Sequence, residues 1–199
     1  MSETPDTYLT ISQNGESSFK EKGSKFISFA FAITSQEQAD EIRRNFKKKY
    51  YDATHVVYAF RLGAEGNIFR AADDGEPSGS SGLPVLNAIK SAGLSDVIVL
   101  VVRYFGGTKL GIPGLIEAYG RAAREVLIVS GSKSTDIVEN VTVEVDYQMF
   151  NFVMRIVKEQ NLKITETVQR KNCRITMAVK KNSVKKITDI LNQNGQITV

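Results

Sequence analysis

The most restrictive stretch of this sequence is "DVIVLVVRY", which runs from Asp96 to Tyr104 near the middle of the chain. It is a continuous apolar run rich in β-branched residues, and such a run is typical of a strand that is buried on both faces. It is far shorter than the roughly eighteen apolar residues of a membrane helix. The chain is therefore expected to fold around a central sheet that has other layers on both sides.

The segments around this run supply those layers. A strand is predicted over Lys25–Ile33, after a polar tail. The helix "SQEQADEIRRNFKKKYY" follows it, then two strands, "THVVYAFRL" and "NIFRAA", joined through the turn sequence "GAEG". Two further helices are predicted, "LPVLNAIKSAG" before the central strand and "GLIEAYGRAAREVLIVSG" after it. The pattern predicts an α+β fold.

The C-terminal part has its own pattern of elements. The polar segment "GSKSTD" is the predicted boundary between an N-terminal domain of residues 1–134 and a C-terminal domain of residues 136–199. The remainder follows the order β-α-β-β-α, with a possible last strand, which is the order that a ferredoxin-like split βαβ unit requires. A length of 199 residues suits two such domains.

Composition narrows the class of protein. Cys173 is the only cysteine, which excludes an intramolecular disulfide and argues against a cysteine-rich zinc site. The N-terminus has no apolar signal-peptide core, so a cytoplasmic location is expected. The net charge of +4 permits an anionic partner without requiring one. Most of this excess positive charge lies after residue 135, in a segment that contains 10 basic and 7 acidic side chains.

An acidic loop, "DDGEPSGSSG", runs from Asp73 to Gly82. Its carboxylates could bind a metal or serve as an acid/base pair, if they converged on one point. The alternative is structural: Asp73 or Asp74 caps the turn and Glu76 pairs with a nearby arginine. A Ser/His/Asp site using the lone His55 lacks the G-x-S-x-G nucleophile elbow. Acidic turns are common, so we favour the structural interpretation and expect no metal or cofactor.

A second loop, "RYFGGTKLGIPG", follows the central strand. Its glycines would let backbone N–H groups approach an anion, and Lys109 adds a positive charge before a helix N-terminus. The alternative is that the glycines only permit a tight crossover. We expect the two loops to meet on one face as a binding surface rather than a catalytic centre, because no base–nucleophile pair is evident. The candidate ligand-binding residues are Asp74, Glu76, Ser78, Arg103, Tyr104, Gly106, Gly107 and Lys109.

A basic edge in the C-terminal part is the second candidate surface. The hairpin "RKNCR" and the lysines that follow it would suit the phosphates of RNA, although such residues also occur on any soluble sheet edge. The candidate RNA contacts are Arg170, Lys171, Arg174, Lys180 and Lys181.

The stretch from "DATHVVYAFRLG" through both loops to "RAAREVL" resembles the signature of the IMPACT/YigZ family, over about residues 16 to 130. The segment after Asp136 is similar to the ferredoxin-like second domain of the bacterial members. One departure is "LGIPGL", where the family pattern has "LGTGGL"; Ile112 and Pro113 stiffen this loop and remove a hydroxyl.

The resemblance implies a fold for each half of the chain. The N-terminal half would resemble the second domain of a small-subunit ribosomal protein, and the C-terminal half domains III and V of the translocating elongation factor. Eukaryotic relatives are linked to translational control: they bind the activator of an initiation-factor kinase through an extra N-terminal domain, which we do not expect in this chain.

We therefore expect a cytoplasmic translation-associated protein that binds ribosome or structured RNA, with translation-factor-like protein partners and no membrane contact. One alternative is an enzyme acting on a phosphorylated ligand at the paired glycine-rich loops. The other is a protein–protein regulator with no nucleic-acid contact. An enzymatic activity is the less expected outcome.

Overall fold

The computed structural model describes residues 6–169 and 172–192. They divide into two compact units: one comprises residues 8–135, and the other comprises residues 136–169 and 172–192 together with Asp6 and Thr7. The fold is of the α+β class, as predicted. None of the helices in the described part of the chain has the length and apolar character needed to cross a bilayer.

The first unit is built on a five-stranded antiparallel sheet in the order β2-β3-β6-β4-β5. The predicted central strand is confirmed: β6 lies in the middle, and its residues from Val97 to Val102 are completely buried. The strands are β2 (Gly15–Glu21), β3 (Ser24–Ala32), β4 (His55–Leu62), β5 (Ile68–Ala72) and β6 (Val97–Tyr104).

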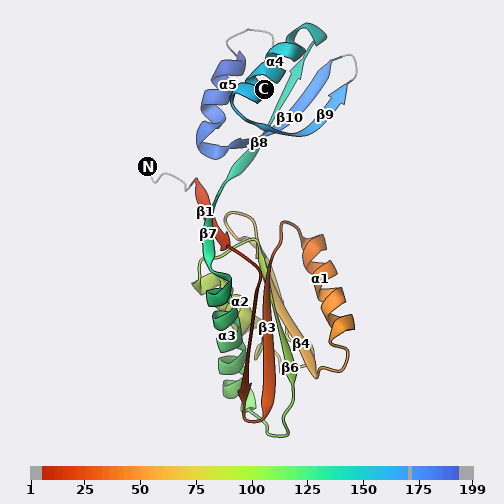
Figure 1. Cartoon of the computed structure of the whole chain (residues 1–199), viewed down its shortest axis with the longest axis vertical. Coiled ribbons are helices and arrows are strands. Elements are labelled where there is room, and N and C mark those ends of the chain that lie inside the picture. Colours follow the sequence, from red (N-terminus) through yellow and green to blue (C-terminus); the bar gives the residue numbers. More distant parts are fainter. Residues whose placement is uncertain (1–5, 170–171, 193–199) are drawn as a thin grey trace. The chain divides into compact units, whose positions relative to one another are not determined.

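Helices cover both faces of this sheet (Figure 1). On one face, α2 (Gly82–Ser91) and α3 (Gly111–Ser130) pack on a core that includes Val99 and Val101. On the other face, α1 (Gln36–Lys49) packs on a core that includes Ile98 and Leu100. Alternate residues of β6 thus serve the two cores, which is the physical reason for its uninterrupted apolar sequence.

The ends of this unit contain strands that their polar sequences do not predict. The polar tail contains β1 (Thr7–Ile11) and β2, and the boundary segment "GSKSTD" contains β7 (Ser132–Asp136). Strands β1 and β7 pair with each other as a two-stranded sheet. This pairing joins segments more than a hundred residues apart, and the polar sequence of β7 carries no apolar alternation that would reveal it.

The second unit has a three-stranded antiparallel sheet in the order β8-β10-β9, covered on one face by two helices. Cys173 lies in its core, as predicted from its phase in the strand. The possible last strand falls outside the described residues. The elements are β8 (Val138–Val145), α4 (Tyr147–Glu159), β9 (Lys163–Gln169), β10 (Cys173–Lys180), a 3₁₀ turn η1 (Lys181–Ser183) and α5 (Val184–Asn192).

Candidate functional site

The acidic loop is a folded turn that begins with a capping aspartate. The carboxylate of Asp73 accepts hydrogen bonds from the backbone N–H groups of Gly79, Ser81 and Gly82 at 2.8, 3.1 and 2.8 Å, and from the Ser81 hydroxyl at 2.8 Å. Helix α2 has no cap from the side chain of its own N-cap residue, Ser81, so Asp73 supplies that cap from across the loop. Burial acts to raise the pKa of the Asp73 carboxyl, but these hydrogen bonds outweigh it and hold the pKa below its usual value.

Asp73→Asn is expected to lower stability in a pH-dependent way. Because the pKa of Asp73 is depressed in the folded state, its stabilisation is fully present above its unfolded pKa of about 4 and is lost as the pH falls through the lower folded value. A neutral amide accepts weaker hydrogen bonds than a carboxylate, so the difference in unfolding free energy between the native protein and Asp73→Asn should be on the order of 1 kcal/mol near neutral pH and should shrink below about pH 4. Urea unfolding at several pH values measures it; a constant difference would contradict the capping role.

Asp74 ties the same loop to two neighbouring elements. Its carboxylate accepts a hydrogen bond from the backbone N–H of Val56 at 2.6 Å and forms an ion pair with Lys47 of α1. Its carbonyl oxygen lies 2.9 Å from Nδ1 of His55, and its backbone has the positive φ of 49° that the tight turn requires. Ser78, by contrast, is exposed to solvent. The carboxylate and the carbonyl oxygen of Asp74 are therefore both used in contacts within the protein, whereas the Ser78 side chain faces solvent.

Glu76 connects the two loops inside the protein. One of its carboxylate oxygens, Oε1, accepts from Nη1 of Arg103 at 2.6 Å and from the Tyr119 hydroxyl at 2.7 Å, and it lies 3.7 Å from Nε2 of His55. The side chains of Glu76 and Arg103 are only 4% and 5% exposed. Burial, followed by the hydrogen bond to Glu76 and the charge of that residue, strongly raises the pKa of the Tyr119 hydroxyl, which stays protonated as a donor.

This arrangement supports the structural interpretation of the acidic loop. A carboxylate that is buried against an arginine and a tyrosine is already bonded within the protein and is shielded from a substrate. The loop serines are occupied as well: the Ser80 hydroxyl donates to the carbonyl of Pro77, and that of Ser81 bonds to Asp73. Within the described residues, no group of three or more His, Cys, Asp or Glu side chains could hold a metal ion.

Two glycines of the second loop have separate structural reasons: Gly106 makes a close backbone approach, and Gly107 has a positive φ. A Cβ atom on Gly106 would lie 1.9 Å from the carbonyl carbon of Gly23, and the N–H of Gly106 donates to the Ser24 hydroxyl at 3.3 Å. The hydroxyl of Ser24 also lies 3.3 Å from Nη2 of Arg103. Gly107 has a positive φ of 87°. The turn between β2 and β3 and the loop after β6 thus form one surface.

Four lysines are exposed on this surface, which we call the hairpin-end surface: Lys20, Lys22, Lys25 and Lys109. Lys20 and Lys25 face each other across β2 and β3, and Lys25 is opposite Tyr104 of β6. Tyr104 itself donates to Asp52 at 3.0 Å. Within the described part of the chain, none of these four lysines forms an ion pair. Of the four, Lys109 alone lies in a segment whose sequence predicts anion binding, and the other three lie in the N-terminal hairpin.

The basic edge predicted for the second unit is partly neutralised. Arg174 pairs with Glu144 at 3.2 Å, and Lys180 pairs with Asp136 at 2.8 Å. Lys181 is half-buried in the 3₁₀ turn. The remaining two candidates, residues 170 and 171, lie outside the described residues. RNA contact by these five candidate residues stays a prediction.

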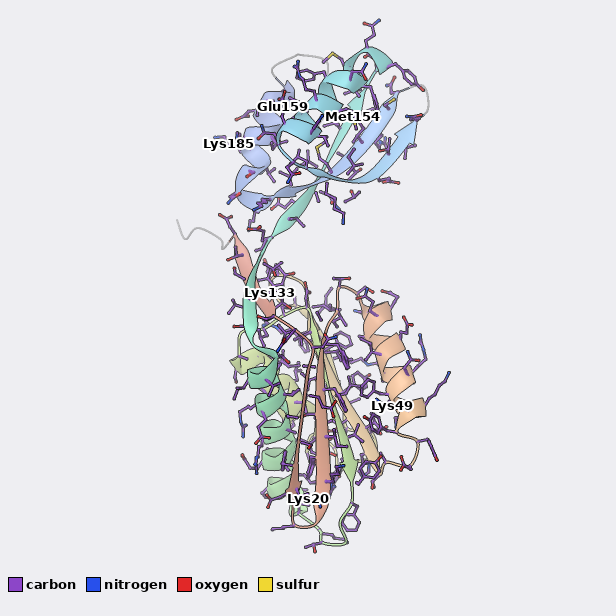
Figure 2. The ribbon with its side chains drawn as sticks, viewed as in Figure 1. Lys20, Lys49, Lys133, Met154, Glu159 and Lys185 are labelled. Atoms are coloured by element: carbon purple, nitrogen blue, oxygen red, sulfur yellow. The ribbon has the colours of Figure 1, made fainter. Side chains whose placement is uncertain are left out.

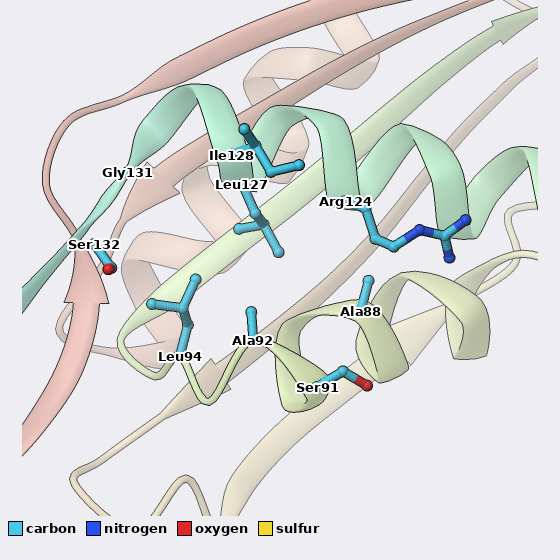
Figure 3. Close-up of a pocket in the computed structure, with 9 residues that line it drawn as sticks. All are labelled: Ala88, Ser91, Ala92, Leu94, Arg124, Leu127, Ile128, Gly131 and Ser132. Atoms are coloured by element: carbon cyan, nitrogen blue, oxygen red, sulfur yellow. The ribbon is translucent and has the colours of Figure 1, made fainter.

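An apolar groove of about 480 Å³ lies between α2 and α3 on the first unit (Figure 3). Leu94 and Leu127 point toward each other across it, Ile128 stands at its rim with 78% of its surface exposed, and Arg124 lies at one end. Arg124 also pairs with Glu117 at 2.8 Å. The groove offers contact area for an apolar partner and contains no residue suited to acid–base chemistry.

Comparison with known proteins places the two loops in a recognised domain. The model of the Impact N-terminal domain matches residues 22–127. The "IMPACT family member YvyE" of Bacillus subtilis is 33% identical over 160 residues, which cover 80% of this chain and 74% of that protein. The "IMPACT family member in pol 5'region" of Thermus thermophilus is 46% identical over 104 residues, or 52% of this chain and 55% of that one.

A solved structure described as "Crystal structure of an hypothetical protein" matches 98% of this chain and 97% of its own, with a TM-score of 0.85 and 23% sequence identity. At that identity the match supports the fold alone.

Proposed function

Because the chain belongs to the IMPACT family, we propose that it is a cytoplasmic translation-associated protein that binds ribosome or structured RNA through its hairpin-end surface. The link to translation comes from the family, whose eukaryotic members act in translational control. We further propose the division into domains at residues 1–134 and 136–199, the first like the second domain of a small-subunit ribosomal protein, the second ferredoxin-like and related to elongation-factor domains III and V.

The single observation that carries the RNA proposal is the unpaired charge of the hairpin-end surface. Lys20 and Lys25 lie directly opposite each other on neighbouring strands, an arrangement of like charges that destabilises a sheet. Lys22 and Lys109 add two more exposed positive charges. An anionic partner would relieve this repulsion, and a phosphate backbone offers regularly spaced negative charges to several lysines at once.

The geometry is less favourable to the two alternatives. An enzyme at the paired loops would need Glu76 or Asp74, and both carboxylates are already bonded within the protein. A protein–protein regulator is supported by one observation, the apolar groove between α2 and α3. The groove and the hairpin-end surface are separate sets of residues, so a protein partner and RNA contact are compatible.

The triple variant Lys20→Gln/Lys25→Gln/Lys109→Gln is expected to weaken binding to ribosomes or structured RNA. If each of the three lysines neutralises one phosphate, the slope of log K against log salt should become shallower by about 2–3 units, at roughly 0.7–0.9 unit for each contact. Lys22, whose φ of 46° lies in the left-handed region, is left in place so that the turn between β2 and β3 is unchanged. Co-sedimentation with ribosomes at several salt concentrations gives the slope.

Lys133→Gln is the matched control. It removes an exposed lysine of the same unit, and Figure 2 shows it at the opposite end of that unit from Lys20. It should leave both affinity and salt slope unchanged. Binding that is lost equally in the control would indicate a general charge effect, and unchanged binding in the triple variant would rule out the hairpin-end surface.

A further inference from the structure

The second unit contains a cavity of about 520 Å³ that none of the preceding functions uses. It lies where the ends of β8, β9 and β10 meet the turn between α4 and β9 and the start of α5. A volume of this size is within the usual range of about 300–1,000 Å³ for small-molecule pockets.

Three lysines, Lys163, Lys180 and Lys186, line this cavity, and its lining includes no acidic residue. Two of them have partners: Lys180 lies 2.8 Å from Asp136, and Lys186 donates to the carboxamide oxygen of Gln160 at 3.3 Å. Lys163 is exposed and forms no ion pair in the described part of the chain. The cavity therefore keeps an excess of positive charge even after the ion pair with Asp136 is counted.

The rest of the lining is of a different chemical kind. Three carboxamides, Asn140, Gln160 and Asn161, each present both donors and an acceptor. Apolar surface is supplied beside them by Val138 and Leu162. This combination of cations, carboxamides and apolar surface suits a ligand with a polyanionic part and a flat polar part.

The turn that carries two of these carboxamides is well defined. Asn161 has a positive φ of 50°, and its backbone N–H donates to the carbonyl of Lys158 at 3.2 Å. The N–H of Leu162 donates to the carbonyl of Val157 at 2.8 Å. This wall of the cavity is thus fixed by the C-terminal end of α4 before any ligand binds, which lowers the ordering cost of binding.

A simpler explanation for the lysines is the dipole of α4, whose negative end favours nearby cations. That explanation covers Lys186, which contacts the helix-ending residue Gln160. It does not require Lys163 and Lys180, which come from two neighbouring strands, to line the same cavity. The dipole effect also falls off within the last turn of a helix.

We propose that this cavity binds a nucleotide, with its phosphates on Lys163, Lys180 and Lys186 and its base against the carboxamides and the apolar wall. Charge-assisted hydrogen bonds from lysine to phosphate would supply most of the affinity. The site is independent of the hairpin-end surface, which lies in the other unit.

The test uses the whole chain and ATP as the probe, with affinity measured by titration calorimetry. Lys163→Gln and Lys186→Gln are each expected to weaken ATP binding about tenfold or more, because each removes one charge-assisted contact. Asn140→Leu should weaken ATP binding but leave the weaker binding of inorganic pyrophosphate unchanged, since it removes a contact to the base only.

Lys185→Gln is the matched control: Lys185, labelled in Figure 2, precedes Lys186 on α5 and is exposed. It is not among the residues that line the cavity. It should bind ATP like the native protein. No ATP binding, or an equal loss in Lys185→Gln, would overturn the proposal, and pyrophosphate bound as tightly as ATP would overturn the recognition of a base. The triple lysine variant of the first unit should keep ATP affinity, so failure of the RNA proposal and of this one are distinguishable.

Discussion

Val99→Asp is expected to prevent the first unit from folding. Val99 lies in β6, is completely buried, and is paired across the sheet with Ala30 and Ala59, which are also completely buried. A carboxylate there would have no partner and would have to be protonated or exposed, at a cost of several kcal/mol. Because the free energy of unfolding of a whole domain is only about 5–15 kcal/mol, this cost is large enough to unfold the first unit.

Hydrogen exchange of the peptides that cover β6, followed by mass spectrometry, reports on this unit separately from the second one. The variant should lose protection throughout residues 97–104. Ser18→Asp is a suitable control because Ser18 is exposed on the edge strand β2, and it should change stability by less than about 0.5 kcal/mol. Full protection in Val99→Asp would refute the two-sided burial of β6.

The elements that could be predicted from the sequence are those whose pattern is local. The apolar run of β6 and the apolar stripes of α1 and α3 each lie within one segment, and burial follows directly from them. Strands β1 and β7 are stabilised by pairing with each other. Neither segment contains a sequence pattern that predicts the other as its partner. Strand β2 is not predicted for a related reason: Phe19 is the one large apolar residue of its sequence, GESSFKE, so there is no apolar alternation to indicate a strand.

The candidate site shows the same limit. The structural interpretation of the acidic loop predicts that Glu76 pairs with an arginine, and the structure shows that this arginine is Arg103, 27 residues later in the chain. Tyr119 was assigned to the apolar stripe of its helix, and its ring is indeed in the core. Its hydroxyl reaches a partner 43 residues earlier in the chain, a contact that helical periodicity cannot reveal. The hairpin-end lysines were missed because they become neighbours only when β2 and β3 pair.

The second large effect is expected from breaking the buried pair of Glu76 and Arg103. Glu76→Leu should lower the free energy of unfolding by about 3–5 kcal/mol, because it leaves the Arg103 charge in the core without a counter-charge. It also removes the acceptor of the Tyr119 hydroxyl. Arg103→Met should cost a similar amount by stranding the carboxylate.

The double variant Glu76→Leu/Arg103→Met distinguishes a structural pair from a functional one. Since it leaves no unpaired charge, it should be more stable than either single variant, and the sum of the single effects should exceed the double effect by several kcal/mol. Tyr119→Phe should lower the free energy of unfolding less in the double variant than in the native protein, because the double variant lacks the Glu76 acceptor of the Tyr119 hydroxyl.

The exposed pair of Arg121 and Glu125 on α3 is the internal control, and its coupling should be only about 0.3–0.5 kcal/mol. Urea unfolding of the native protein, the two single variants and the double variant gives the coupling energy of Glu76 and Arg103 from a double-mutant cycle. RNA binding by the folded double variant then tests whether the pair is needed for function. If the pair only joins the two loops, the folded double variant should still bind RNA through its lysines. A stable Glu76→Leu protein that has lost binding or turnover would instead assign Glu76 a direct part in function, because its effect could then not come from the fold.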